Sequence, residues 1–497
     1  MNRRNFLSHA SAFITLGASG VLLPNISFAN SQTSLSGKAK LQMPPLLDAQ
    51  AQGAFELTAH VGSTNFLGAS PTQTMGFNGS YLGPTLRIAR GSNKARVNNM
   101  IDEVTTVHWH GLLIPGYQDG GPHQPIAPKE SWEVDLDIDQ PPATTWYHSH
   151  MHGRTAYQVH QGLAGVIQIS DGRDRDRGLP DTYGVDDLML VLQDRNFDND
   201  GRMVFTQSMM DIMHGLTGNT MMVNGQVDAV ATPPKGLTRL RLLNGSNARV
   251  FSLFFSDQRN MYLIATDSGY LEKSITLDEI KLSPGERAEI LVDFSDGIRT
   301  ALMSRSDSHD TMAGTMSSMD SMNGSGHNMM GSSHGATEEA FLIIPFQPDE
   351  RLKATIDQMP VDLGASGHAE MGLPARTREF VLNMEPMAIN NMSFDMERIN
   401  EKIEQGEVER WIIRGEEMPH PFHVHGAAFK VLSQNGNAPR PEETGWKDTV
   451  LVGDESEILI RFKHLAGPET PFMYHCHILE HEDAGMMGQF TVSPKIT

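Results

Sequence analysis

One strand–turn–strand pattern occurs three times along this chain of 497 residues. The stretch LRIARGSNKARVNNMIDEVTTVHWHG (86–111) corresponds to INEKIEQGEVERWIIRGEEMPHPFHVHG (399–426). PPKGLTRLRLLNGSNARVFSLFFSD (233–257) is a weaker third copy. In each copy a strand with alternating charges, a polar turn and a second strand follow one another. Such internal repetition indicates a chain built from related structural units.

The strands that follow are repeated as well. They are ESWEVDLDIDQPPATTWYHSH (130–150), ERAEILVDFSD (286–296) and SEILIRFKHLAGPETPFMYHCH (456–477). Short β-branched or aromatic runs separated by Gly, Pro and Asn clusters are typical of β-sandwiches. We therefore predict an all-β fold of three related domains at residues 45–172, 180–345 and 376–497, with 351–375 as a linker. The middle copy lacks matching histidines, so we expect the second domain to be largely structural.

The first residues read as an export signal. Arg3 and Arg4 precede an apolar run that ends near Leu23, and Ser27-Phe28-Ala29 offers a small-x-small cleavage site. This predicts a signal peptide over residues 1–29. The paired arginines resemble a twin-arginine signal, which carries folded proteins across a bacterial inner membrane; an ordinary secretory signal is the alternative. We expect a periplasmic protein without a membrane span, because no other apolar stretch approaches spanning length.

Charge and cysteine usage narrow the possible functions. The chain carries 39 basic and 60 acidic residues, a formal net charge of -21. This excess argues against nucleic acid as a partner, since phosphates require clustered Lys and Arg, and it suits a cationic substrate. Exported proteins usually contain disulfides, yet this chain has a single cysteine, so its stability must come from packing. It also has 30 Met and 21 His.

Histidines spaced two residues apart occur in four clusters, two in each terminal domain. On an extended strand alternate side chains share one face, with backbones about 7 Å apart. That spacing suits two neighbouring metal ions, so the four pairs predict eight imidazoles around one metal cluster between the domains. The clusters are His108-Trp-His110, His148-Ser-His150, His420-Pro-Phe-His423-Val-His425 and His475-Cys-His477. We expect no metal at His60, His123, His160 or His464, and His152 is ambiguous.

The lone cysteine, Cys476, lies between two of these histidines and must face the opposite way. There it can meet His420 and His481, with Met486 as a weak axial neighbour and Met487 as its competitor. A thiolate, two imidazoles and a long thioether form a blue-copper site. Zinc is the rival metal, but a closed four-ligand zinc site would leave the other imidazoles unused. When Tyr147 is aligned with Tyr474, the first domain has Ser149 where the third has Cys476.

These clusters resemble the copper-binding motifs of the laccase-like multicopper oxidases, which consist of three cupredoxin (Greek-key β-sandwich) domains. The resemblance covers essentially the whole mature chain and implies four copper ions. It assigns the type 1 copper to His420, Cys476, His481 and Met486, and the type 2 copper to His108 and His423. It assigns the type 3 pair to His110, His148 and His477 on one ion and His150, His425 and His475 on the other. It implies four one-electron oxidations coupled to the reduction of dioxygen to two waters.

Two carboxylates match positions near the oxygen site. Asp119, in PGYQDGG, and Glu482, next to His481, match acidic positions that the family uses there, and proton supply is their expected role. We expect Asp448, in GWKDTV, to orient a ligand histidine.

Within the family, HILEHEDAGMM, NGSNAR and the twin-arginine signal most resemble bacterial periplasmic cuprous oxidases of copper tolerance. The low-complexity segment 304–339 is rich in Met and His, and thioether sulfur favours Cu(I). The resemblance suggests Glu416, Met418, Met384 and Met387 as ligands of substrate copper. The sequence departs from the close relatives in two ways. Its Met-rich segment precedes NMEPM (383–387), and Ile389 and Asn390 stand where an Asp is expected.

We therefore expect a Cu(I) oxidase that acts as a monomer, uses dioxygen and has modest activity on small phenols. The first alternative is a general laccase that oxidises phenols and aromatic amines. From a different class, an exported copper-storage protein would bind copper without consuming oxygen. Copper-free scaffold relatives have lost ligand histidines, whereas all ten are present here.

Overall fold

The computed structural model describes residues 39–306, 340–364 and 367–495. The expected signal peptide (1–29) lies outside these ranges, as does most of the Met- and His-rich segment 303–334. Within them the chain consists mainly of strands, with only short helices. The expected all-β class is confirmed. No helix in the described ranges is long and apolar enough to cross a membrane.

The first group of strands forms two sheets, with the orders β1-β4-β8-β7 and β3-β2-β5-β6. The bounds are β1 (Leu46–Asp48), β2 (Ala54–Thr64), β3 (Thr72–Phe77), β4 (Thr85–Ala89), β5 (Gly91–Asn99), β6 (Ser131–Ile138), β7 (Ala143–His148) and β8 (Ala164–Ser170). A 3-10 turn, η1 (Gly116–Gln118), precedes β6, and the helix α1 (Thr155–Gln161) lies between β7 and β8.

The second group has one large sheet, β10-β9-β13-β18-β15-β16 with β11 also paired to β9, beside β17-β14-β19-β20 and the pair β12-β21. Its bounds are β9 (Asp187–Phe197), β10 (Met203–Val204), β11 (Thr220–Val223), β12 (Pro234–Lys235), β13 (Leu237–Asn244), β14 (Phe251–Phe255), β15 (Met261–Thr266), β16 (Gly269–Leu277), β17 (Ile280–Leu282), β18 (Arg287–Asp293), β19 (Thr300–Arg305), β20 (Ala340–Phe346) and β21 (Asp349–Lys353). The helix α2 (Met209–His214) lies between β10 and β11.

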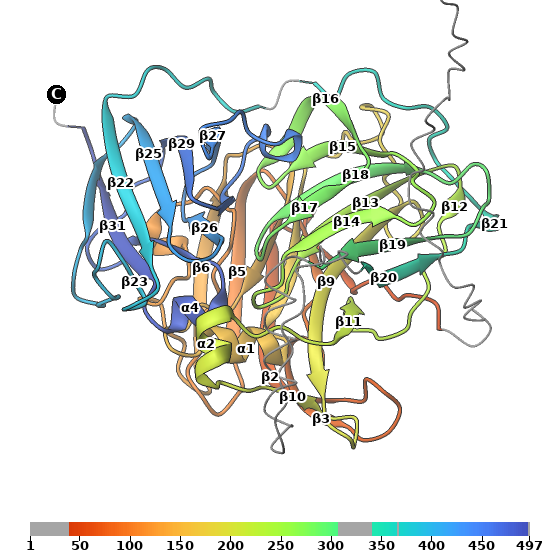
Figure 1. The fold of residues 1–497 in the computed structure, drawn as a ribbon, viewed down its shortest axis with the longest axis horizontal. Helices are drawn as coiled ribbons and strands as arrows, with labels where there is room; N and C mark the ends of the chain where they lie inside the picture. Colours follow the sequence, from red (N-terminus) through yellow and green to blue (C-terminus); the bar gives the residue numbers. More distant parts are fainter. Residues whose placement is uncertain (1–38, 307–339, 365–366, 496–497) are drawn as a thin grey trace, which may run out of the picture. The chain divides into compact units, whose positions relative to one another are not determined.

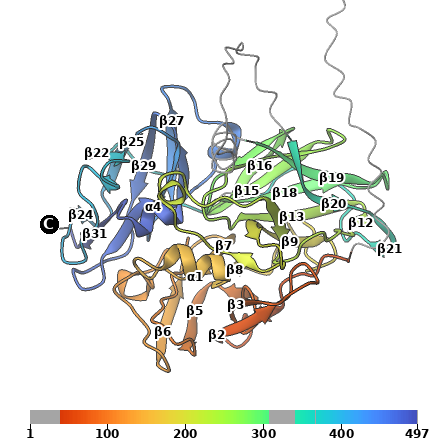
Figure 2. The ribbon, with the colours of Figure 1, turned by 60° about the horizontal axis from the view of Figure 1, so that its bottom comes forward.

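The third group again has two sheets, β23-β22-β25-β29-β27 and β24-β31-β30-β26-β28. Its bounds are β22 (Arg376–Asn383), β23 (Ala388–Ile389), β24 (Glu401–Glu404), β25 (Val408–Gly415), β26 (His420–Val424), β27 (Phe429–Gln434), β28 (Thr449–Val452), β29 (Glu455–Arg461), β30 (Phe472–Cys476) and β31 (Met487–Ser493). The turn η2 (Pro441–Glu443) and the helix α4 (Leu479–Asp483) complete it. Colour separates the groups in Figures 1 and 2: red to orange, yellow to teal, and cyan to blue.

The three groups repeat one arrangement of strands, as the sequence copies predict. Strand β2 pairs in parallel with β5, β9 with β13 and β22 with β25. The second strand of each pair then pairs antiparallel with β6, β18 or β29. The first and third groups share a further arrangement, because β4 and β8 are parallel with β7 antiparallel, and so are β24 and β31 with β30. Strands β7 and β30, which carry histidine pairs, therefore occupy equivalent places.

The charged alternating strands place every second residue in a core. In β5, Ala95 and Val97 are buried between exposed Lys94 and Arg96. In β25, Trp411 and Ile413 are buried in the same way and pack with β29 and β30 residues. Burying one large apolar side chain stabilises the fold by roughly 1.5–3 kcal/mol. Each of these strands therefore buries one apolar face in a sandwich core while its charged residues lie on the other face.

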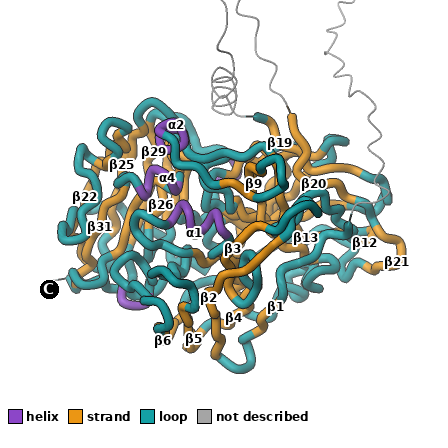
Figure 3. Tube along the Cα trace, turned by 90° about the horizontal axis from the view of Figure 1, so that it is seen from below, coloured by secondary structure: helices purple, strands orange, loops and turns teal. Residues whose placement is uncertain are grey.

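The proposed boundaries 45–172, 180–345 and 376–497 enclose these groups, apart from β21. That strand lies past residue 345 and pairs in parallel with β12. The helices α1, α2 and α4 come from three different groups yet lie side by side, with α4 in contact with both α1 and α2 (Figures 1 and 3). The segments that meet near α4 contain most of the candidate chemistry.

Candidate metal centre

The lone cysteine lies in a fully buried triad with two imidazoles. Cys476 ends β30, and its Sγ lies 3.5 Å from Nδ1 of His420 and 3.6 Å from Nδ1 of His481. His420 begins β26, which pairs with β30, and His481 lies on α4. The three ligand atoms lie within 4.8 Å of one another, close enough to bind one ion.

The two candidate methionines lie on different sides of β30. Met487 pairs with His475 across β30 and β31, so its side chain shares the face of that imidazole. Met486 packs in the same hydrophobic cluster as Cys476, and its carbonyl accepts a hydrogen bond from the Cys476 N–H at 3.1 Å. Of these two methionines, Met486 is therefore the one that packs in the hydrophobic cluster of Cys476.

The four histidine pairs converge on one buried space between the first and third groups. Rings from the two groups stack on each other, His108 on His425 at 3.8 Å between centroids and His110 on His423 at 3.7 Å. His150 Nε2 and His425 Nε2 each lie 3.3 Å from His475 Nε2. The eight imidazoles, all essentially inaccessible to solvent, are His108, His110, His148, His150, His423, His425, His475 and His477.

The pairs lie at strand ends rather than within strands, which corrects the expectation of two residues on one extended strand. His148 and His475 are in β7 and β30, while His150 and His477 lie just past those strands. His425 likewise follows β26, and His110 is in a turn after an isolated bridge at His108. Leaving the strand lets the second ring of each pair turn inward, and centroids within a pair are 5.0–5.9 Å apart.

Most rings use one nitrogen as an anchor and direct the other toward the shared space. The Nδ1 atoms of His108, His148 and His423 hydrogen-bond to the backbone carbonyls of Asp119, Ser149 and Asp448 at 2.8–3.0 Å. Their Nε2 atoms are buried without a hydrogen-bond partner among the described residues. His110 is reversed: Nε2 is anchored and Nδ1 lacks a partner. Anchored imidazoles with unused inward nitrogens fit metal ions.

Burial favours the neutral form of most of these rings, which metal binding requires. Burial and the neighbouring imidazoles lower the pKa of His110, His148, His150, His423, His425 and His477 well below 6.5. Burial likewise lowers the pKa of His475 and of His481 to about 3. Burial raises the pKa of the Cys476 thiol, so metal binding must displace its proton. The donor set of imidazoles, one thiolate and a thioether fits copper.

The histidines that the resemblance assigns to one copper ion lie near one another in the structure. His150, His425 and His475 form one group with ligand atoms within 4.8 Å. His110, His148 and His477 form a triangle with centroids 5.1–5.7 Å apart. The centroids of His108 and His423 are 5.9 Å apart. The division of the eight rings among three ions remains a prediction, since His108 also groups with His110 and His148.

Both expected acidic residues lie beside Nδ1 atoms of cluster histidines. Asp119 Oδ2 accepts a hydrogen bond from His425 Nδ1 at 2.7 Å and lies 3.4 Å from His108 Nδ1. The two carboxyl oxygens of Glu482 lie 3.3 Å from His150 Nδ1 and 3.2 Å from His475 Nδ1. Burial raises the pKa of Glu482 well above the usual carboxyl range. Burial therefore favours the protonated form of Glu482 beside the cluster.

Asp448 orients two rings, and Arg287 holds Asp448 in place. Asp448 Oδ1 lies 3.1 Å from His110 Nε2, while its backbone carbonyl accepts from His423 Nδ1. The fully buried Arg287 of β18 donates to both carboxyl oxygens of Asp448, and its Nη1 lies 3.2 Å from His110 Nε2. Its remaining donors reach the carbonyls of Thr144 and Asp267.

Arg287 shows that the second group contacts the surroundings of the cluster. The second group adds a further contact at the cysteine triad, where His481 Nε2 donates to the Met213 carbonyl at 3.1 Å. The second group supplies no histidine to the eight-ring cluster among the described residues. It instead supplies charge and hydrogen-bond acceptors, which single-sequence motifs do not reveal.

The four residues suggested for substrate copper meet beside His420. The backbone carbonyl of Glu416 accepts from His420 Nε2 at 3.1 Å, and its carboxylate accepts from Asn383 at 3.1 Å. Glu416 is exposed, whereas Met384 and Met418 are buried in the third core. Met387 is partly buried against that core. The structure thus brings NMEPM and Glu416 together at the edge of the cysteine triad.

Three other histidines of the described ranges lie outside the groups of metal-ligating side chains. His152, the ambiguous case, has its ring against Phe394 at 4.9 Å, and His123 pairs with Gln489. The fully buried His160 contacts Phe205, and burial lowers its pKa well below 6.5. None of the three is in a group of metal-ligating side chains among the described residues.

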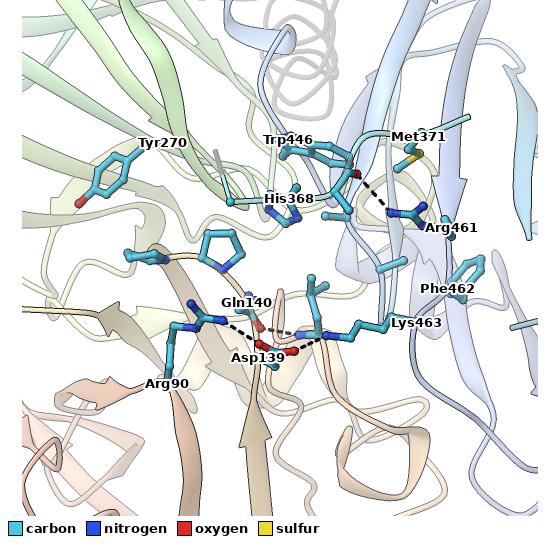
Figure 4. Close-up of a pocket in the computed structure, with 18 of the residues that line it drawn as sticks. Arg90, Asp139, Gln140, Tyr270, His368, Met371, Trp446, Arg461, Phe462 and Lys463 are labelled. Atoms are coloured by element: carbon cyan, nitrogen blue, oxygen red, sulfur yellow. Dashed lines mark hydrogen bonds and ion pairs between the residues drawn. The ribbon is translucent and has the colours of Figure 1, made fainter. Parts of the chain in front are cut away.

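A cavity of about 860 Å³ lies where segments of all three groups meet (Figure 4). Arg90 and Lys463 point at Asp139 from opposite sides, and the His368 ring stacks on Trp446 at 4.5 Å. Its lining includes Gly426, next to a cluster histidine, but none of the predicted ligands. Because several of its charges pair with one another, the cavity adds no group to the candidate centre.

Comparison with known proteins agrees with this geometry. Three family models described as multicopper oxidase match residues 58–174, 181–327 and 369–495. Cell division protein FtsP of Xenorhabdus nematophila is 36% identical over 99% of both chains.

Solved structures of the same class are similar as well. The laccase-like multicopper oxidase CueO of Ochrobactrum sp., described as active on lignin model compounds and lignosulfonate, is 39% identical with a TM-score of 0.82, covering 91% of this chain and 100% of that one. A multicopper oxidase from Campylobacter jejuni, described as a metallo-oxidase, is 26% identical with a TM-score of 0.75, covering 92% of this chain and 96% of that one.

Proposed function

Because this chain belongs to the multicopper oxidase family, we propose that it is a copper-dependent oxidase that transfers electrons from Cu(I) to dioxygen. Four Cu(I) ions are oxidised to Cu(II), while one dioxygen takes up four electrons and four protons to give two waters. One observation carries the proposal. Cys476 faces His420 and His481, while its covalent neighbours His475 and His477 face the eight-imidazole cluster.

Four copper ions are proposed at these residues. His420, Cys476, His481 and Met486 would hold the type 1 ion, and the eight-imidazole cluster the other three. When bound, copper supplies one-electron chemistry at the cysteine and oxygen reduction at the cluster. The chain itself provides a direct covalent connection between the two places, because Cys476 is bonded to His475 and His477 through the backbone. Because all these ligands are buried, bulk water is excluded from the cysteine triad and from the eight-imidazole cluster.

Protons are proposed to reach the cluster through Glu482. Its carboxyl group lies against His150 and His475, and burial raises its pKa well above the usual carboxyl range. Asp119 accepts the Nδ1–H of His425, which leaves Nε2 of that ring as the available ligand atom. We therefore assign proton supply to Glu482 and orientation of His425 to Asp119.

Cu(I) as the reductant is supported by soft ligands near His420. The sulfur atoms of Met384, Met387 and Met418 belong to segments that meet at Glu416, and thioethers favour Cu(I). The excess of acidic residues also suits a cation.

Substituting Met384 and Met418 by Leu should lower the rate of Cu(I) oxidation more than that of phenol oxidation. Met261→Leu, in the core of the second group, is the matched control for a buried methionine. Equal losses for both reductants would favour the alternative, a general laccase.

A second candidate function comes from the relatives named for cell division, several of which are 32–36% identical to this chain. A purely structural role would need neither copper nor oxygen, and a storage role would need copper alone. Copper content and oxygen uptake of the purified protein separate these three. The complete ligand set favours the oxidase. We further propose export to the periplasm on the basis of residues 1–29, as a soluble monomer that binds no nucleic acid.

A further inference from the structure

The helix α2 combines soft ligands with unusual exposure. Its six residues, Met-Met-Asp-Ile-Met-His, include three methionines and end in His214. Met209 is 77% exposed and Met210 41% exposed, values high for thioether side chains. None of these side chains is a candidate ligand of the centre described above, although the Met213 carbonyl accepts from His481.

The helix is held in one conformation at its start. Ser208 caps it by accepting from the Asp211 N–H, and the Asp211 carboxylate accepts from the Ser208 N–H. This reciprocal capping box satisfies two backbone donors that a short helix would otherwise leave unpaired. The methionines therefore project from a fixed helix rather than from a loose loop.

Helical spacing places two sulfurs and one imidazole together. Residues three and four apart are neighbours on a helix surface, with Cβ atoms about 5–6 Å apart. Met213 and His214 are related to Met210 by these two spacings, so both can share an ion with its sulfur. Two thioethers and an imidazole form a soft donor set that suits Cu(I) better than harder divalent ions.

The end of α2 also contacts the cysteine triad. His481 Nε2 donates to the Met213 carbonyl at 3.1 Å, while Nδ1 of the same ring lies 3.6 Å from Cys476 Sγ. Figure 3 shows α2 next to α4, the helix that carries His481. One imidazole therefore separates the backbone of α2 from the cysteine sulfur.

We propose that Met210, Met213 and His214 bind a Cu(I) ion, and that this site is a second point of electron entry, on the His481 side. It rests on the proposed oxidase function but uses residues distinct from those beside His420. Each Cu(I) bound there loses one electron and leaves as Cu(II). Four such electrons, with four protons, reduce one dioxygen to two waters.

The test begins with binding rather than turnover. The copper-loaded protein is titrated anaerobically with Cu(I) against bicinchoninate, a coloured Cu(I) chelator. A variant with Met210→Leu, Met213→Leu and His214→Gln keeps helix-compatible side chains. Met100→Leu and Met392→Leu, at exposed positions outside α2, are the matched controls. We expect the α2 variant to bind one Cu(I) fewer than wild type, with both controls unchanged.

The second readout is the rate at which the blue colour bleaches on mixing with Cu(I) or with hydroquinone. The ratio of the two rates should fall in the α2 variant and stay constant in the controls. An α2 variant that binds as many Cu(I) ions as wild type would overturn the inference while leaving the oxidase proposal intact. Wild type that binds the extra Cu(I) but never oxidises it would overturn the oxidase proposal and the entry role, and would confirm only the binding site.

Discussion

The guanidinium of Arg287 donates to both carboxyl oxygens of Asp448, at 2.8 Å to Oδ1 and 2.5 Å to Oδ2. Asp448 in turn lies 3.1 Å from His110 Nε2. This chain of contacts runs from the second group through the third to a ligand histidine of the first. The middle domain, which supplies no ring to the cluster among the described residues, thus determines how a ring from another domain is held.

Replacing Arg287 by Lys should weaken copper binding at the cluster. Lysine keeps the charge but cannot form bidentate hydrogen bonds with the carboxylate of Asp448. Loss of a residue that orients a metal ligand typically lowers metal affinity about 10- to 100-fold. Copper content after dialysis against a chelator measures the loss of affinity. Arg195→Lys is the control, because Arg195 is a buried arginine that contacts the carbonyls of residues 160 and 194 instead. Equal copper retention in the two variants would contradict the assigned role.

Glu482→Gln should slow the oxygen step without slowing reduction at Cys476. Glutamine preserves size but cannot release a proton, and a positioned acid typically contributes about 10²–10⁴-fold. Stopped-flow absorption separates the two steps, because bleaching reports reduction and recovery of the colour reports oxidation by dioxygen. Glu480→Gln is the matched control on the same helix, since Glu480 contacts Asn247 rather than a cluster ring. Normal recovery of colour in the Glu482 variant would exclude it as the proton source.

Glu443→Gln should change how stability depends on pH. Burial raises the pKa of Glu443 from 4.5 to about 7, although Lys447 and Arg440 lower it. Between about pH 4.5 and 7 the unfolded state loses this proton while the folded state keeps it. Wild type should therefore lose stability as pH rises through this window, by up to about 3 kcal/mol, and glutamine should remove that loss. A difference in Tm between the two proteins that stays constant from pH 4.5 to 8 would contradict this.

Ser149→Cys should not create a second blue centre. Ser149 occupies the place in the first domain that Cys476 has in the third, and it also points away from the cluster. Its hydroxyl donates to Gln158 Oε1 at 2.5 Å and lies 3.3 Å from Thr105 Oγ1, whereas the Cys476 sulfur lies near two imidazoles. The variant should show wild-type copper content and unchanged intensity of the blue absorption. A doubled blue absorption would mean that the flanking histidines alone create the centre.

The histidine pairs could be predicted from the sequence because their spacing and repetition are local properties. The place of Cys476 opposite His475 and His477 followed from strand geometry in the same way. The turn of each second ring at the strand end could not be predicted, because it depends on where pairing with the neighbouring strand stops. Arg287 was missed because it gains its role only when β18 packs against two other domains. The contact of His481 with α2 was missed for the same reason.

The most direct test of the account is oxygen uptake by copper-loaded protein given Cu(I), with wild type beside Cys476→Ser. Wild type should consume one dioxygen for every four Cu(I) oxidised, and it should be blue. The serine variant should fold, retain copper at the eight-imidazole cluster, lose the blue colour and consume oxygen no faster than buffer with free copper. Wild-type protein that binds copper without consuming oxygen, or a serine variant that consumes it as fast as wild type, would contradict the central claim.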